Sequence, residues 1–302
     1  MTAPDTGAPE PVGVIGLGSM GAPIAQRFTA WPGGLVVCDA RPEATEKAVA
    51  AGARSVRTAA EVAADASVVS ITVLDDAQVR SVVTGPGGVL ETARPGTVVA
   101  VHSTIAPETA VDLARICAEN GVDLVDAPVS GGAPGAEQGR LAIMVGGDRS
   151  AYEKVKPVFA LVSDMTIHAG PIGAGTRMKL ARNLLHFISF TAAAEASRLA
   201  EAAGVDITKL GKVVRHTDAI TGGAGAIILR DSTAEVAEDD FWYSIFTHVR
   251  GLGEKDVSLA LALADEVGVD LPLGRLALDG LGDGLGVGPG PIAAAHREKA
   301  TS

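Results

Sequence analysis

Short apolar runs separated by helical patterns occupy the chain up to about residue 170. The clearest runs are Val12–Ile15, Leu35–Cys38, Val68–Val73, Thr97–His102 and Leu141–Val145. Runs of this length are typical of strands that are buried on both faces of a sheet. Because helical patterns alternate with them, the sequence predicts a doubly wound parallel sheet with right-handed crossovers.

The second half of the chain shows helical patterns only, with no strand alternation after about His168. The patterns cover Leu180–Ala203, Ile207–Arg215, Ile227–Asp231 and Val249–Val267, and another begins at Leu271. Gly280 to Gly290 is rich in glycine, which favours loose structure. We therefore predict an α/β fold in which residues 170–302 form an all-α domain that begins with a long interdomain helix.

A glycine turn follows the first apolar run and leads into a helical pattern. The turn is a GxGxxG motif made of Gly16, Leu17, Gly18, Ser19, Met20 and Gly21. The second run ends in Asp39, about 20 residues beyond the glycines. Strand, glycine turn, helix, strand and acid together form the dinucleotide-binding arrangement of a Rossmann domain. The sequence therefore predicts a nucleotide-binding domain over residues 12–169, preceded by a flexible tail over residues 1–11.

Asp39 bears on which nucleotide is bound. A carboxylate at this position accepts hydrogen bonds from the adenosine ribose and repels a 2′-phosphate, so NAD is favoured over NADP. Arg41 lies two residues further on and leaves NADP possible, since a guanidinium can approach that phosphate. We favour the interpretation of Arg41 as a solvated loop residue before Pro42.

Candidate site residues also follow later strands, at the edge where ligands bind in such sheets. Leu74 and Asp75 come after the third clear run, and Ser103 and Thr104 come after the fourth. For Asp75 we favour a helix cap over a ligand contact. For Ser103 and Thr104 a cap and a site role stay equally open.

Ser130, Gly131 and Gly132 form a second glycine turn after an apolar segment. Successive backbone N–H groups and a hydroxyl in such a turn make a nest that suits a carboxylate. An ordinary glycine turn is the competing interpretation, and on this pattern alone it is favoured.

Lys179 and Asn183 stand at the start of the long helical pattern, after a cluster of glycines that begins at Gly170. They are four residues apart and so share one helix face, at a joint where we expect a cleft. A lysine that is partly buried there has a lowered pKa and becomes an acid/base near neutral pH. The alternative is a lysine that reaches to solvent along an apolar helix.

Composition excludes several classes of function. The net charge of −11 argues against nucleic-acid binding, and hydrophobic residues at 47% are ample for a core. Two cysteines and six scattered histidines lack the spacing of a disulfide framework or a metal site. No apolar run is long enough to span a membrane, and the first residues do not resemble a signal peptide. We therefore predict a cytoplasmic protein without a metal.

Four motifs in one order resemble the β-hydroxyacid dehydrogenase family, whose best-known member is 3-hydroxyisobutyrate dehydrogenase. The family's GxGxMGxxxA opening matches the first glycine turn with Ala25, and its DxPVSGG motif begins at Asp126. Its GxxGxGxxxKxxxN motif spans Gly170 to Asn183, and its KDxxLA motif begins at Lys255. The resemblance extends from about Val12 to Leu273.

The resemblance implies hydride transfer between NAD and a small 3-hydroxy acid. It makes Lys179 the catalytic acid/base, lets Asn183 position the substrate, and places the substrate carboxylate on the Ser130 turn. Thr104 and Lys255 would contact the cofactor, with Leu74 also at the cofactor site. It further implies a homodimer or homotetramer. The rival interpretation is an NADPH-dependent reductase of small aldehydes such as glyoxylate or succinic semialdehyde, and a non-catalytic NAD-binding protein is a third.

The chain also departs from the family pattern on the substrate side. Arg182 precedes Asn183 where a small or amide residue is common, and His186 follows one turn later. The segment Phe241–His248 is unusually aromatic, and for Trp242 and Phe246 we favour packing over substrate contact. These departures leave the identity of the substrate side chain open.

Overall fold

The computed structural model describes residues 9–301, and their side chains up to residue 298. The chain divides into two compact units, one ending at Arg182 and the other beginning at Asn183. The division falls inside helix α8 (Ala174–Ala202), the predicted interdomain helix. Residues 1–8 of the predicted tail lie outside the described residues. The end of that tail is bound to the first unit, because Trp31 Nε1 donates to the carbonyl of Glu10 and the N–H of Ser67 donates to the carbonyl of Pro11.

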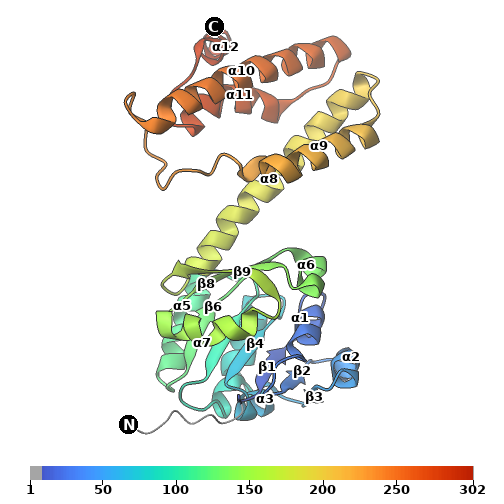
Figure 1. Ribbon diagram of the computed structural model, residues 1–302, viewed down its shortest axis with the longest axis vertical. Helices are drawn as coiled ribbons and strands as arrows, with labels where there is room; N and C mark the ends of the chain where they lie inside the picture. The colour runs from blue at the N-terminus through green and yellow to red at the C-terminus, as the bar shows by residue number, and fades with distance from the viewer. Residues whose placement is uncertain (1–8, 302) are drawn as a thin grey trace. The chain divides into compact units, whose positions relative to one another are not determined.

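The first unit is built on a sheet (Figure 1), and the five clearest apolar runs of the sequence correspond to its strands β1, β2, β4, β5 and β8. The strands are β1 (Val12–Ile15), β2 (Leu35–Cys38), β3 (Arg54–Ser55), β4 (Val68–Ile71), β5 (Val98–Val101), β6 (Asp123–Asp126), β7 (Val129–Ser130), β8 (Leu141–Gly146) and β9 (Ser163–Gly170). Their order is β3-β2-β1-β4-β5-β6-β8-β7, and β9 pairs with β8. Alternate residues of the central strands face two separate cores, so both faces of the sheet are buried.

Helices cover both faces, as predicted for a doubly wound sheet. One core contains side chains of α1 (Gly21–Phe28), α6 (Gly132–Gln138) and α7 (Arg149–Phe159). The other contains side chains of α3 (Ala59–Asp65), α4 (Asp76–Thr84) and α5 (Pro107–Ala118). A 3₁₀ turn over Pro42–Thr45 and the short helix α2 (Glu46–Ala50) follow β2, and a second 3₁₀ turn covers Val89–Glu91. The fold class predicted from the sequence is confirmed for this unit.

One part of the sheet differs from the prediction. Strands β1 to β6 are parallel, but β8 runs antiparallel to β6 and β7, and β9 is parallel to β8. Between β6 and β8 the chain returns through tight turns at Gly131 and Gly139, whose φ angles are positive. Residues 127–140, which contain β7 and α6, bring the chain back so that β8 pairs antiparallel with β6 and β7. The pattern of apolar residues does not report strand direction, so it could not show this reversal.

In the part of the second unit that the structure describes, all regular secondary structure is helical, as predicted. Besides most of α8 it holds α9 (Ile207–Thr221), a 3₁₀ turn over Gly223–Gly225, α10 (Phe241–Val267), α11 (Pro272–Gly284) and α12 (Pro291–Thr301). None of the described helices is long and apolar enough to cross a membrane.

Three details of the helical prediction are wrong. Ile227–Asp231 is not helical, and α10 begins at Phe241 rather than at Val249, because Asp240 accepts a hydrogen bond from the N–H of Trp242. The stretch predicted to be loose contains the end of α11 and precedes α12. Gly282 is needed there for close packing, since a Cβ at this position would lie 2.0 Å from the carbonyl oxygen of Gly288.

Three helices begin at carboxylates that distant segments supply. The two oxygens of Asp126 accept from the N–H groups of Gly173 and Thr176 at the start of α8. Glu195 accepts from Leu273 and Gly274 at the start of α11. Glu254 accepts from Gly290 and Ala293 at the start of α12. All three acids are buried, with exposed fractions of 0%, 6% and 1%. A carboxylate satisfies the unpaired N–H groups of a helix start and opposes the positive end of its dipole.

Candidate active site

The first glycine turn connects β1 to α1 and has the shape of a phosphate cradle. Gly16 has a φ of 88°, and a Cβ on Gly21 would lie 1.9 Å from the carbonyl oxygen of Gly16. A Cβ on Gly18 would meet nothing within 4 Å, so this residue faces open space. No side chain caps α1 at Met20. The first N–H groups of the helix are therefore available to an anion, and the residues present fit a dinucleotide pyrophosphate.

The remaining residues of the turn divide between core and surface. Leu17 is buried in the core on one face of the sheet, Met20 packs against the same core, and Ser19 is exposed.

Asp39 lies beside this turn at the end of β2. Its Oδ2 accepts from the N–H of Leu17 at 2.6 Å, and its Oδ1 accepts from the N–H of Arg41 at 2.8 Å. The Arg41 guanidinium lies 3.6 Å from the same carboxylate, with most of its side chain exposed. The structure therefore brings the predicted acid and the glycine turn together.

Residues that follow β4 and β5 lie at the same edge of the sheet as the glycine turn, because β4 pairs in parallel with β1 and β5 pairs in parallel with β4. Leu74 is 80% exposed and Thr104 is exposed. Asp75 accepts from the N–H of Gln78 and caps α4, which confirms the favoured interpretation. Ser103 is buried, and its hydroxyl donates to the carbonyl of Val73 at 2.6 Å, so it has a structural partner.

Lys179 is buried against the second glycine turn. Its Nζ donates to the carbonyl of Val129 at 2.7 Å and to the hydroxyl of Ser130 at 3.0 Å. Only 9% of the residue is exposed. Burial lowers the pKa of Lys179, and the positive charge of Arg182 lowers it further. A lysine that has a lowered pKa beside a turn of this kind is suited to proton transfer.

The turn itself has the backbone that a nest requires. Gly131 and Gly132 have φ angles of 125° and 64°, which residues other than glycine rarely adopt. Ser130 is half-buried, and both glycines are exposed where α6 begins. The structure therefore places Ser130, Gly131 and Gly132 next to Lys179.

Two close backbone approaches hold the start of α8 on the sheet. A Cβ on Gly175 would lie 2.2 Å from the carbonyl oxygen of Met144, and a Cβ on Gly146 would lie 2.7 Å from the backbone nitrogen of Gly175. Burial raises the pKa of Asp126, while the N–H groups of Thr176 and Gly173 act in the opposite direction.

The other two predicted site residues belong to the helical unit. Asn183 follows Lys179 by one helical turn and is half-buried. Lys255 lies in α10 with its Nζ 3.1 Å from Asp256, and more than half of its side chain is exposed. Their predicted roles stay predictions.

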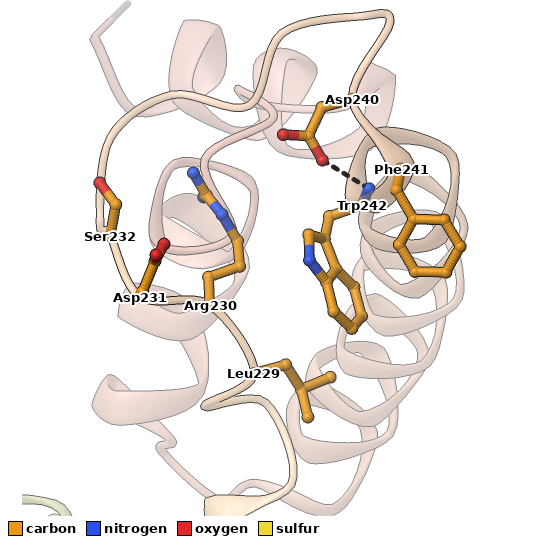
Figure 2. Close-up of a pocket in the computed structure, with 7 residues that line it drawn as sticks. All are labelled: Leu229, Arg230, Asp231, Ser232, Asp240, Phe241 and Trp242. Carbon is orange, nitrogen blue, oxygen red and sulfur yellow. Dashed lines mark hydrogen bonds between the residues drawn. The ribbon is translucent and has the colours of Figure 1, made fainter.

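The aromatic segment at the start of α10 borders a cavity of about 740 Å³ (Figure 2). The cavity is lined by Leu229, Arg230, Asp231, Ser232, Asp240, Phe241 and Trp242. None of the predicted site residues lines it. Phe246 is 3% exposed, stacks on Trp242 and packs with Val236 and Leu285, which confirms a packing role for Phe246.

Sequence reasoning missed two polar residues beneath the site. Asp126 was noted only as the first residue of a motif, and His102 only as the last residue of an apolar run. Both have hydrogen-bond partners distant in sequence, at residues 173 and 176 for Asp126 and at Ser70 and Ala127 for His102. Among the described residues, no group of three or more histidine, cysteine or acidic side chains could hold a metal ion.

Two sequence families match the chain in succession. One is described as the NAD binding domain of 6-phosphogluconate dehydrogenase and matches residues 11–170. The other is described as the NAD-binding part of NADP-dependent 3-hydroxyisobutyrate dehydrogenase and matches residues 173–281. The chain belongs to the β-hydroxyacid dehydrogenase family. As a member of this family it is an NAD(P)-dependent oxidoreductase.

Similar proteins match nearly the whole length of this chain. An uncharacterized oxidoreductase of Mycobacterium tuberculosis is 56% identical over 276 residues, which are 91% of this chain and 93% of the relative. The 2-(hydroxymethyl)glutarate dehydrogenase of Eubacterium barkeri is 31% identical over 92% of this chain and 90% of its own. The crystal structure of an oxidoreductase from Mycobacterium avium 104 has a TM-score of 0.88 and 57% identity, covering 92% of this chain and 99% of that one.

Proposed function

We propose that this chain oxidises a small 3-hydroxy acid, of the 3-hydroxyisobutyrate type, with NAD as hydride acceptor. The observation that carries the proposal is the buried Lys179 amine against the Ser130 turn. A neutral amine has two N–H groups and one lone pair. Because Val129 and Ser130 accept both N–H groups, the lone pair is left for the proton of a substrate hydroxyl.

The Ser130 turn is proposed to bind the substrate carboxylate. The Ser130 hydroxyl and the N–H groups of Gly131 and Gly132 are the donors, and the positive φ angles of the glycines support this nest. The carboxylate end is thereby fixed near Lys179. Asn183 is proposed to orient the hydroxyl group, since a side-chain amide can both donate and accept.

Bound nicotinamide would supply the hydride acceptor. The first glycine turn would hold the pyrophosphate, and Leu74, Thr104 and Lys255 are proposed as further cofactor contacts. In oxidation Lys179 takes the hydroxyl proton at Nζ, and in reduction it returns that proton to the developing alkoxide oxygen. The substrate proton thus remains on the chain while the hydride is transferred.

We propose NAD rather than NADP because Asp39 presents a carboxylate where the adenosine ribose would lie. Arg41, whose Nε is 3.6 Å from that carboxylate, is the observation that favours NADP. With NADPH the same site would serve the alternative function, the reduction of small aldehydes such as glyoxylate or succinic semialdehyde. A non-catalytic NAD-binding role would not account for the buried Lys179 amine beside the Ser130 turn.

The test is NADH or NADPH formation by the purified protein with a panel of 3-hydroxy acids, each assayed with NAD and with NADP, together with NADPH consumption in the presence of small semialdehydes. Turnover of 3-hydroxyisobutyrate or a close analogue with NAD supports the proposal. Turnover of semialdehydes alone, with NADPH, replaces it by the alternative. Tight NADH binding without turnover of any panel member would mean that the departures at Arg182 and Trp242 have changed the substrate class, or that the protein has the non-catalytic role. Asp39→Asn should raise the preference for NADP, while Asp75→Asn, at a capping acid on the same sheet edge, should not.

We also propose that the protein is a homodimer or homotetramer paired through α8 and α9. Leu184, Phe187 and Ile188 of α8 are 47–65% exposed, and no residue of α9 is buried. Apolar surface of this extent on neighbouring positions marks an interaction site. Sedimentation should show an oligomer that Phe187→Glu dissociates. Leu276→Glu, at an exposed leucine of α11, is the matched control and should not.

A further inference from the structure

His102 is a buried histidine that the proposed reaction leaves without a role. It lies just beyond β5 and is 6% exposed. Its Nδ1 lies 2.7 Å from the carbonyl oxygen of Ala127 and its Nε2 lies 3.0 Å from the hydroxyl of Ser70. Its ring also packs against Phe159, with 5.2 Å between the ring centroids. The three residues that make these contacts, Ala127, Ser70 and Phe159, all belong to the first unit.

The partners decide the state of the ring. A carbonyl oxygen can only accept, so Nδ1 carries the proton and donates to Ala127. Nε2 then accepts from the Ser70 hydroxyl. Burial lowers the pKa of His102 to about 4, and the ring stays neutral in this tautomer around neutral pH. His102 is therefore a fixed spacer between β4 and Ala127 rather than a group that titrates during turnover.

His102 binds Ala127, which lies in the segment of residues 126–130 that contacts Lys179 and the start of its helix. Ala127 is fixed on both sides, since its N–H donates to Val101 at 2.7 Å and its carbonyl accepts from His102. Asp126, just before it, binds the start of α8. Val129 and Ser130, just after it, bind the Nζ of Lys179. Residues 126–130 thus hold Lys179 twice, by its helix and by its amine.

We propose that His102 is a positioning residue that keeps residues 126–130 in register and thereby sets the position of the Lys179 amine. This inference rests on the proposed role of Lys179 as the acid/base. His102 itself does not touch the reacting atoms. Its effect passes through Ala127 to the two ends of the segment.

Two substitutions at His102 and one control separate positioning from bulk stability. His102→Leu removes both hydrogen bonds. His102→Asn keeps an amide N–H close to the place of Nδ1 and can still donate to Ala127. Ser163→Ala is the control, because it removes a buried hydroxyl of the same unit that donates to the carbonyl of Leu141 at 2.7 Å and accepts from Met165 and Thr166 at 3.1 Å.

The kinetic readout is kcat and KM for the hydroxy acid, followed against pH. We expect His102→Leu to lower kcat by about 10- to 100-fold with KM changed far less, since small misplacements of a catalytic group act on the reaction step. The acid limb of the profile should also move to higher pH, because a loosened Lys179 regains water. His102→Asn should restore most of kcat. Ser163→Ala should lower the melting temperature without moving kcat or the limb. If His102→Leu behaved like Ser163→Ala, the proposal would be overturned.

Hydrogen exchange provides a readout that does not need turnover. The amides of Gly173 and Thr176, both bound to Asp126, should exchange faster in His102→Leu than in Ser163→Ala at an equal loss of melting temperature. Equal exchange would overturn the positioning role. If the wild type turned over no hydroxy acid, the proposed function would fail, and exchange at these amides would still decide how His102 acts on the segment.

Discussion

Replacement of Lys179 by methionine is the sharpest test of the active site. Methionine has nearly the length of the lysine stem and keeps its apolar contacts, while the amine is lost. The carbonyl of Val129 and the hydroxyl of Ser130 each lose a donor. The substitution therefore removes proton transfer and two hydrogen bonds with little change in packing.

The two losses differ in size. A positioned general base contributes about 10²- to 10⁴-fold, which corresponds to about 3–5 kcal/mol of activation free energy. An acceptor left without its partner costs about 1–3 kcal/mol of folding stability when it is buried. Val129 and Ser130 are only half-buried, so the lower end applies. Because small domains are stable by about 5–15 kcal/mol, Lys179→Met should remain folded and lose its turnover.

The assay is kcat/KM for the hydroxy acid from neutral to alkaline pH, with NADH binding followed by fluorescence. In the wild type kcat/KM should rise with pH until Lys179 is neutral, at a pH below the ordinary lysine pKa of 10.5. In Lys179→Met this rise should vanish while NADH still binds. Arg177→Met, at an exposed cation on the same helix, is the control and should keep the rise. A Lys179→Met enzyme with more than about a tenth of the turnover, or with the same rise, would refute the reasoning.

Three further outcomes follow from the buried and charged groups. Arg182→Met should raise the pKa of Lys179, since Arg182 helps to lower it, and the kinetic rise should move to higher pH. Glu254→Ala should destabilise the start of α12 by about 2–3 kcal/mol and lower the melting temperature by about 5–10 °C. Glu266→Ala is the control and should do neither, because Glu266 is an exposed acid of α10, the helix that carries Glu254. The pKa of His102 falls from 6.5 to about 4 on folding, so the unfolded chain binds more protons between these values. The neutral His102 therefore contributes about 3 kcal/mol to the free energy of unfolding above pH 6.5, and this contribution is lost as the pH falls toward 4. Urea unfolding across this pH range should show the loss, and in His102→Leu the loss should be absent.

The features that short-range spacing encodes were predictable from the sequence. The glycine turn and Asp39 stand a fixed number of residues apart, and the structure joins them through the N–H of Leu17. The Asp75 cap acts three residues ahead of itself, at Gln78. Lys179 and the Ser130 turn were also singled out, although their contact spans 49 residues, because each carries chemistry of its own.

Features that depend on a distant partner could not be predicted in this way. His102 ended an apolar run and gave no sign that Ser70 and Ala127 would face it. Asp126 opened a motif without showing that it would bind the start of α8. The direction of β8 is invisible to hydrophobic periodicity, which is the same for parallel and antiparallel pairs. Gly282 was interpreted as a loosening residue because its close neighbour, Gly288, comes together with it only in the fold.

The three carboxylates that hold the starts of α8, α11 and α12 also bear on the order of synthesis. Asp126, Glu195 and Glu254 each come earlier in the chain than the helix start they bind, by between 36 and 79 residues. A ribosome makes the N-terminal residues first, so each acceptor is already present when its helix emerges. None of the three starts has to wait for a residue still to be translated, and each helix can be fixed in place as soon as its first turn is made.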